Sequence, residues 1–69
     1  MTYEYPKPDD IRTGFKVSWF LYSNLEDAER AAALAREVMK AKLEQGYDFG
    51  YQMPGFIEKS EQGYEVTIP

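Results

Sequence analysis

The chain has 69 residues and a formal net charge of −4, with 43% hydrophobic and 16% aromatic residues. A chain of this length forms one domain, and the absence of cysteine excludes disulfide bridges and thiolate chemistry. Histidine is also absent, which removes the commonest general base and most zinc sites. We therefore expect a protein that is not an enzyme and that carries no metal and no cofactor.

The first 14 residues are predicted to form an N-terminal arm, and residues 15–69 the single folded domain. Tyr3 and Tyr5 alternate as in a strand fragment, but the proline-rich residues 6–10 break strand pairing. The two tyrosines indicate that the arm lies on another part of the molecule.

Residues 15–22 alternate between two sets of side chains and are predicted to form the first strand. We expect one set to face the helix that follows, namely Phe15, Val17, Trp19 and Leu21. The other set is expected on the opposite, open face of the sheet: Lys16, Ser18, Phe20 and Tyr22, joined by Glu65 and Thr67 of the last strand.

Residues 23–46 are predicted to form a long helix whose two ends are both marked in the sequence. Ser23, followed three residues later by Glu26, matches a capping box, and Asn24 is the alternative cap. Gly46 is expected to end the helix, because glycine adopts the left-handed conformation without a steric penalty.

One side of this helix is rich in alanine and is expected to lie against the sheet. Leu34 and Ala41 lie at the border of the apolar side and widen it. They belong either to the core of the domain or to a contact with a second subunit.

The residues after the helix alternate again, with apolar side chains at odd positions from Tyr47 to Ile57. This pattern predicts one long strand bent at Pro54, and the alternative is a type II turn over residues 53–56. A second turn at residues 60–63 leads to the last strand, which places Lys59 opposite Tyr64 and Ile57 opposite Val66. 

The predicted fold is therefore an α+β domain of the order β-α-β-β, with one long helix on one face of a small, mainly antiparallel sheet. A strand that contains proline belongs at the edge of a sheet, so the last strand is expected between the other two, in the order 1-3-2. In its topology this arrangement resembles half of a ferredoxin-like fold.

The same register predicts a homodimer. The last strand ends before it can cover residues 47–53, and an unpaired strand edge is a template for another chain. The alternative to the dimer is that the 53–56 turn satisfies this segment within the chain. Independently, the alternative to an interface at Phe20 and Tyr22 is that the arm covers these two side chains through Tyr3 and Tyr5. The candidate interface residues are Tyr3, Tyr5, Phe20, Tyr22, Leu34, Ala41, Tyr47, Phe49, Tyr51 and Met53.

The negative charge is concentrated near the C-terminus. After residue 45 the chain has four acids (Asp48, Glu58, Glu61 and Glu65) and one base, Lys59. This balance disfavours direct nucleic-acid binding, and no apolar run is long enough for a membrane span, so we expect a cytoplasmic protein. The predicted function is a small acidic protein-interaction module with a protein partner that is basic, of the inhibitor or mimic type found in phage and mobile elements. The alternative is a small-ligand binder with an aromatic pocket.

Overall fold

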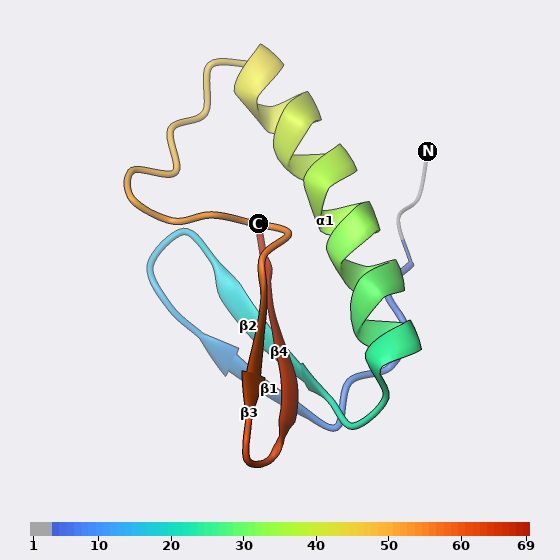
Figure 1. Ribbon diagram of the computed structural model, residues 1–69. Coiled ribbons are helices and arrows are strands. Elements are labelled where there is room, and N and C mark those ends of the chain that lie inside the picture. Colours follow the sequence, from blue (N-terminus) through green and yellow to red (C-terminus); the bar gives the residue numbers. More distant parts are fainter. Residues whose placement is uncertain (1–3) are drawn as a thin grey trace.

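The computed structural model describes residues 4–69, in which one helix packs on a four-stranded antiparallel sheet (Figure 1). This confirms the predicted α+β class. The elements in chain order are β1 (Asp10–Thr13), β2 (Ser18–Tyr22), α1 (Leu25–Glu44), β3 (Ile57–Ser60) and β4 (Gly63–Ile68).

The strand order is β1-β2-β4-β3, and every neighbouring pair is antiparallel. The last strand does lie between two others, but the predicted three-stranded order 1-3-2 is wrong because the arm contributes a fourth strand. The Gly14 N–H donates to the Val17 carbonyl at 2.9 Å, which closes a β1–β2 hairpin after the proline-rich residues. The likeness to half of a ferredoxin-like fold stays a prediction.

The β3–β4 hairpin has the predicted register, with Lys59 opposite Tyr64 and Ile57 opposite Val66. Residues 47–53, in contrast, form no strand and belong to the loop between α1 and β3. The predicted turn over residues 53–56 explains the difference: the Phe56 N–H donates to the Met53 carbonyl at 3.3 Å, and Gly55 has a φ of +88°. The predicted homodimer therefore loses the strand on which it was based.

Both ends of α1 are closed by hydrogen bonds. The predicted Ser23 cap is wrong: Asn24 is the N-cap, and its side-chain oxygen accepts from the Glu26 N–H at 2.7 Å and from the Asp27 N–H at 3.4 Å. At the other end Gly46 has a φ of +87°, as predicted. Its N–H donates to the Leu43 carbonyl, and the next N–H donates to the Lys42 carbonyl, each at 3.0 Å.

The core lies between α1 and the two central strands. Four alanines of the helix are fully buried, and they let the backbone approach the sheet closely. The buried core consists of Ala28, Ala31, Ala32, Ala35, Tyr22, Val66 and Ile68, with Tyr5, Phe20, Ile57 and Tyr64 packed around it. 

The two sets of side chains on β2 have the reverse orientation to the predicted one. Tyr22, only 2% exposed, and Phe20 point to the helix side and pack with the buried alanines. Trp19 and Leu21 therefore point to the open face. The rings of Phe20 and Tyr22 fill the space beside the small alanine side chains of α1. This explains why Phe20 and Tyr22 lie on the core side of β2, and Trp19 on the other side.

The helix extends past the end of the sheet, and the 45–56 loop runs back beside this projecting part (Figure 1). Twenty helical residues span about 30 Å, whereas the longest strand has six residues. Within residues 4–69, no helix is long and apolar enough to cross a membrane.

Candidate functional site

The face of the sheet away from α1, called here the open face, carries two rows of side chains that cross the strands. The strand register aligns Arg12, Trp19 and Thr67 in the first row. The second row consists of Asp10, Leu21, Glu65 and Glu58. The open face therefore has an aromatic row beside an acidic one.

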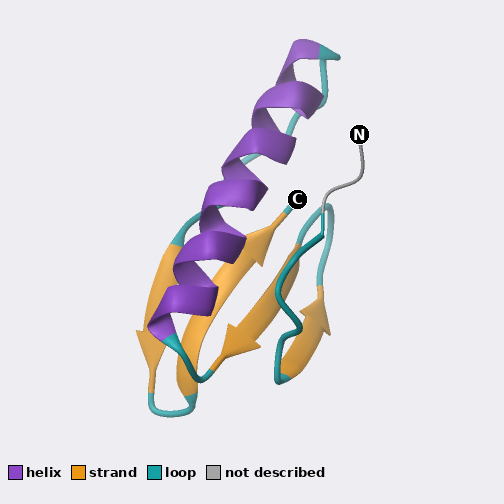
Figure 2. Cartoon of the chain, turned by 90° about the vertical axis from the view of Figure 1, so that its right-hand side faces the viewer, coloured by secondary structure: helices purple, strands orange, loops and turns teal. Residues whose placement is uncertain are grey.

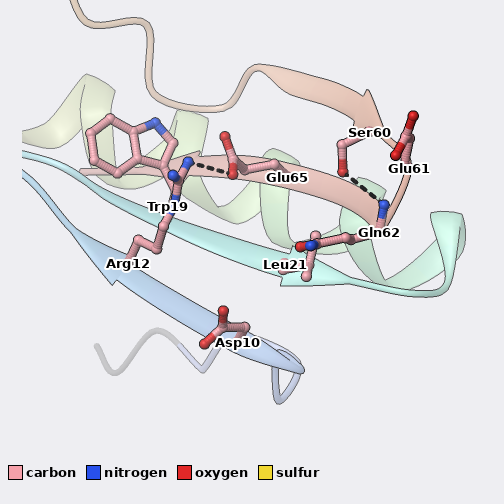
Figure 3. A pocket seen from close by; sticks show the side chains of 8 residues that line it. All are labelled: Asp10, Arg12, Trp19, Leu21, Ser60, Glu61, Gln62 and Glu65. Carbon is pink, nitrogen blue, oxygen red and sulfur yellow. Dashed lines mark hydrogen bonds and ion pairs between the residues drawn. The ribbon is translucent and has the colours of Figure 1, made fainter.

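A shallow hollow of about 390 Å³ lies on the open face between β1 and the β3–β4 hairpin (Figure 3). It is lined by Asp10, Arg12, Trp19, Leu21, Ser60, Glu61, Gln62 and Glu65. Leu21 lies at its floor, and the charged side chains stand around the rim, with α1 behind the sheet (Figure 3).

Trp19 is held at one end of the hollow by the neighbouring hairpin. A Cβ atom placed on Gly14 would overlap the six-membered ring of the indole, so the missing side chain at this position leaves room for Trp19. The Arg12 guanidinium carbon lies 5.6 Å from the centre of the Trp19 ring, within the range of a cation–π contact.

The rim of the hollow is negative. An Arg12 nitrogen lies 2.7 Å from a Glu65 carboxylate oxygen, so the single base of the rim is already paired. Asp10 and Glu61 add two further carboxylates. These acids are spread apart, because residues 4–69 contain no group of three acidic side chains that could hold one metal ion. The arrangement suits an extended cationic partner better than a single ion.

Two of the predicted interface residues, Phe20 and Tyr22, are covered by the arm on the helix side. The Tyr5 ring meets the Phe20 ring edge-on, with the ring centres 5.6 Å apart, and the Tyr22 hydroxyl donates to the Pro6 carbonyl at 2.7 Å. Figure 2 shows this segment running beside α1 over the same face of the sheet. The predicted alternative, in which the arm covers these side chains, is thus observed for Tyr5, and Tyr3 lies outside the described residues.

Burial changes the chemistry of the Tyr22 hydroxyl. Loss of water around this group, helped by the negative charge of Asp27 and by Tyr5, raises the pKa of Tyr22 to about 12. The hydroxyl therefore keeps its proton and its hydrogen bond to Pro6 to a higher pH than a tyrosine with the ordinary pKa.

The predicted interface residues of the α1–β3 loop differ in burial. Phe49 is buried, whereas Tyr51 is fully exposed and Met53 is 68% exposed. Tyr47 packs on the Phe49 ring, and the ammonium groups of Lys16 and Lys42 lie 5.7 and 5.3 Å from its ring centre.

The two helix candidates are both half-buried. Leu34 lines a groove of about 420 Å³ between the arm and α1, together with Glu4, Pro6, Arg30, Ala33 and Glu37. Ala41 lies near the C-terminal end of α1. Neither residue is close to the open face.

Three of the four predicted acidic surface residues converge on the open face. Glu58 lies opposite Glu65 on the neighbouring strand, and Glu61 lies in the hairpin turn beside the hollow. Asp48 lies elsewhere, in the α1–β3 loop, where its side chain accepts from the Gly50 N–H at 2.8 Å.

Six residues of the hollow were absent from the predicted site: Asp10, Arg12, Trp19, Leu21, Ser60 and Gln62. Asp10 and Arg12 lie on β1, a strand that was not predicted because the prolines of the arm indicated that strand pairing was broken there. The alternation of residues 10–13, with Asp10 and Arg12 on one side and Ile11 on the other, is the signal in the sequence that indicates this strand.

Comparisons with protein-family models, curated proteins and solved structures found no match for this chain. We therefore infer the function from the open face.

Proposed function

We propose that this protein is a non-enzymatic interaction module whose open face binds a basic, partly apolar segment of another protein. The observation that supports the proposal is the acidic row beside Trp19 and Leu21 in the hollow of the open face. An inhibitor that masks the basic surface of a nucleic-acid-binding protein is one role that such a module can have.

Charge and shape both support a basic partner. The hollow has three carboxylates and one guanidinium, and a partner with lysine or arginine side chains would complete this charge pattern. The indole ring offers a flat apolar surface and a site for a cationic side chain, and tryptophan is enriched among the residues that dominate interface energies. The chain as a whole is also acidic, with a net charge of −4.

The test is a titration with a basic amphipathic peptide, followed by the fluorescence of Trp19, the single tryptophan. We expect saturable binding that weakens with salt, because exposed charges are screened within about 10 Å at 0.1 M ionic strength. Glu65→Gln should weaken binding several-fold. The matched control is Glu29→Gln, which removes the same charge from the exposed side of α1 and should leave affinity unchanged.

A second pair of variants tests the apolar part of the surface. Trp19→Ala should reduce affinity by about tenfold or more, the usual effect of truncating an interface tryptophan, with binding followed by calorimetry. Tyr51→Ala removes an aromatic ring that is fully exposed on the far loop and should have no effect. Equal losses in the two variants, or binding that is unaffected by Glu65→Gln, would overturn the proposal.

A small-ligand binder is the second candidate, favoured by the volume of the hollow, which lies within the roughly 300–1,000 Å³ typical of ligand sites. Its rim is charged, and Trp19 is its single aromatic side chain among the lining residues, which favours the protein partner. Calorimetric titration against flavins and nucleotides separates the two. Tight binding of one such compound, abolished by Trp19→Ala, would favour the ligand binder.

A further inference from the structure

The edge strand β1 has backbone groups that point away from the sheet. The Gly14–Val17 hydrogen bond fixes which residues of β1 are hydrogen-bonded to β2. The backbone N–H and carbonyl groups of Asp10 and Arg12 face β2, and those of Ile11 point away from the sheet. In agreement with this, the Ile11 N–H donates to its neighbour's side chain, Asp10 Oδ1, at 2.9 Å. Within residues 4–69 no strand lies outside β1 (Figure 2).

We infer that two copies of this chain pair antiparallel along β1, with a two-fold axis that passes beside Ile11. In this arrangement the two Ile11 residues face each other and exchange their N–H and carbonyl groups. Asp10 of each copy then lies opposite Arg12 of the other, so the dimer contains two symmetry-related ion pairs.

The register is selected by charge. Residues that face each other across a ladder must point to the same face of the sheet, so the axis has to coincide with a residue and not fall between two. An axis at Asp10 or at Arg12 would place like charges opposite each other. An axis at Thr13 would pair Arg12 with Gly14 and form no ion pair. Ile11, which is 54% exposed in the single chain, is the position on β1 that places opposite charges across the axis.

The other edge strand does not offer the same fit. On β3 the corresponding central positions are Glu58 and Lys59, and self-pairing at either one would bring two like charges together. An axis at Ile57 would pair Glu58 with Phe56 and form no ion pair, so β1 is the edge at which self-pairing places opposite charges across from each other.

The polar groups of β1 can all be satisfied in the pair. The Ile11 N–H exchanges the Asp10 carboxylate for the carbonyl of the second copy, which frees Asp10. The Arg12 side chain is 65% exposed and contacts Glu65 through one nitrogen. Glu65 lies two strands inward from β1 and the second copy lies on its outer side, so Arg12 would exchange Glu65 of its own chain for Asp10 of the other.

Pairing along β1 would join two open faces into one continuous sheet surface and bring the rims of the two hollows together. A four-residue edge buries little area, so we expect a weak dimer that forms between micromolar and millimolar concentration. This inference does not depend on the proposed basic partner, because it rests on the register of β1 alone.

Sedimentation equilibrium over that concentration range tests the pairing. The wild-type mass should rise from 8.0 kDa towards twice that value. Ile11→Pro removes the outward N–H, a change that edge strands tolerate, and should keep the protein monomeric. The matched control is Lys59→Pro on the other edge, where the N–H also points outward, and it should dimerise like the wild type.

A charge exchange gives a second test that leaves the backbone unchanged. Asp10→Lys and Arg12→Glu should each weaken self-association by about tenfold, because each places two like-charged pairs across the axis. An equimolar mixture of the two variants should associate again. A constant mass of 8.0 kDa for the wild type, unchanged dimerisation of Ile11→Pro, or a mixture that stays monomeric although both variants are folded would overturn the inference.

Discussion

Arg12 and Glu65 are paired at 2.7 Å although a whole strand lies between them, because the guanidinium reaches from β1 over Trp19 of β2 to β4. The pair covers part of the aromatic row and neutralises one of the three carboxylates around the hollow. Arg12 therefore competes with the cationic side chain of a partner for the Glu65 carboxylate.

Removing this competitor should strengthen binding. Arg12→Gln frees the Glu65 carboxylate, and we expect the affinity for a basic peptide to rise by about threefold to tenfold in a calorimetric titration. The free energy of unfolding should change by less than about 1 kcal/mol, because exposed ion pairs contribute little. A lower affinity in Arg12→Gln would show that Arg12 itself contacts the partner.

The second prediction concerns the contact between Gly14 and Trp19. Gly14→Ala places a methyl group where the indole lies, so the ring must move, at a cost of about 1–3 kcal/mol in unfolding free energy. Urea denaturation and a shift of the tryptophan emission measure the two effects. In Trp19→Phe, which lacks the overlapping ring atoms, the same Gly14→Ala change should cost much less, and equal costs would contradict the contact.

The third prediction concerns the N-cap of α1. Asn24→Ala should lower the unfolding free energy by about 1 kcal/mol, because the Glu26 and Asp27 amides lose their acceptor. Ser23 contributes only its backbone N–H, which donates to the Asp9 carboxylate, so Ser23→Ala should have a much smaller effect. The urea midpoints of the two variants decide between the two caps. A larger loss of stability in Ser23→Ala than in Asn24→Ala would identify Ser23 as the N-cap.

The fourth prediction is a loss of stability at high pH. The pKa of Tyr22 is raised from 10.0 to about 12, so the folded state holds this proton more tightly than the unfolded state. The contribution is complete below pH 10 and should be lost as the pH rises to about 12. 

Tyr22→Phe removes both the titrating group and the hydrogen bond to Pro6, so this variant should be less stable at pH 8 but lose less stability between pH 10 and 12. Urea midpoints across this range measure the difference. The control at pH 8, Tyr47→Phe, removes a hydroxyl from a ring that is 38% exposed, and its stability should stay close to that of the wild type. If Tyr22→Phe also followed the wild-type curve, burial of the Tyr22 hydroxyl would not be the cause.

The parts of the fold that local rules determine could be predicted from the sequence. Gly46 ends the helix because the left-handed conformation there favours glycine. The β3–β4 register followed from the short turn at residues 60–63, since the loop length fixes which residues face each other. The 53–56 turn was predicted as an alternative to a bent strand, because proline and glycine stand at its two central positions.

The residues of the open face could not be predicted, because the two alternating sets of side chains on β2 are nearly equally apolar. On β2, Trp19 and Leu21 are as apolar as Phe20 and Tyr22, so alternation alone does not say which set is buried. The alanines of α1 and the Tyr5 ring decide it, and both are distant in sequence. The predicted site therefore included the buried set, and the acidic residues Glu58, Glu61 and Glu65 were its one part on the correct face.

The most direct test of the central claim is a map of the binding surface by NMR. Isotopically labelled protein is titrated with a basic amphipathic peptide, and the amide signals are followed together with the indole N–H of Trp19. Binding through the open face predicts the largest shifts at Arg12, Trp19, Leu21 and Glu65, with little change on the exposed side of α1. Shifts centred on α1 or on residues 47–53, or no shifts at millimolar peptide, would contradict it.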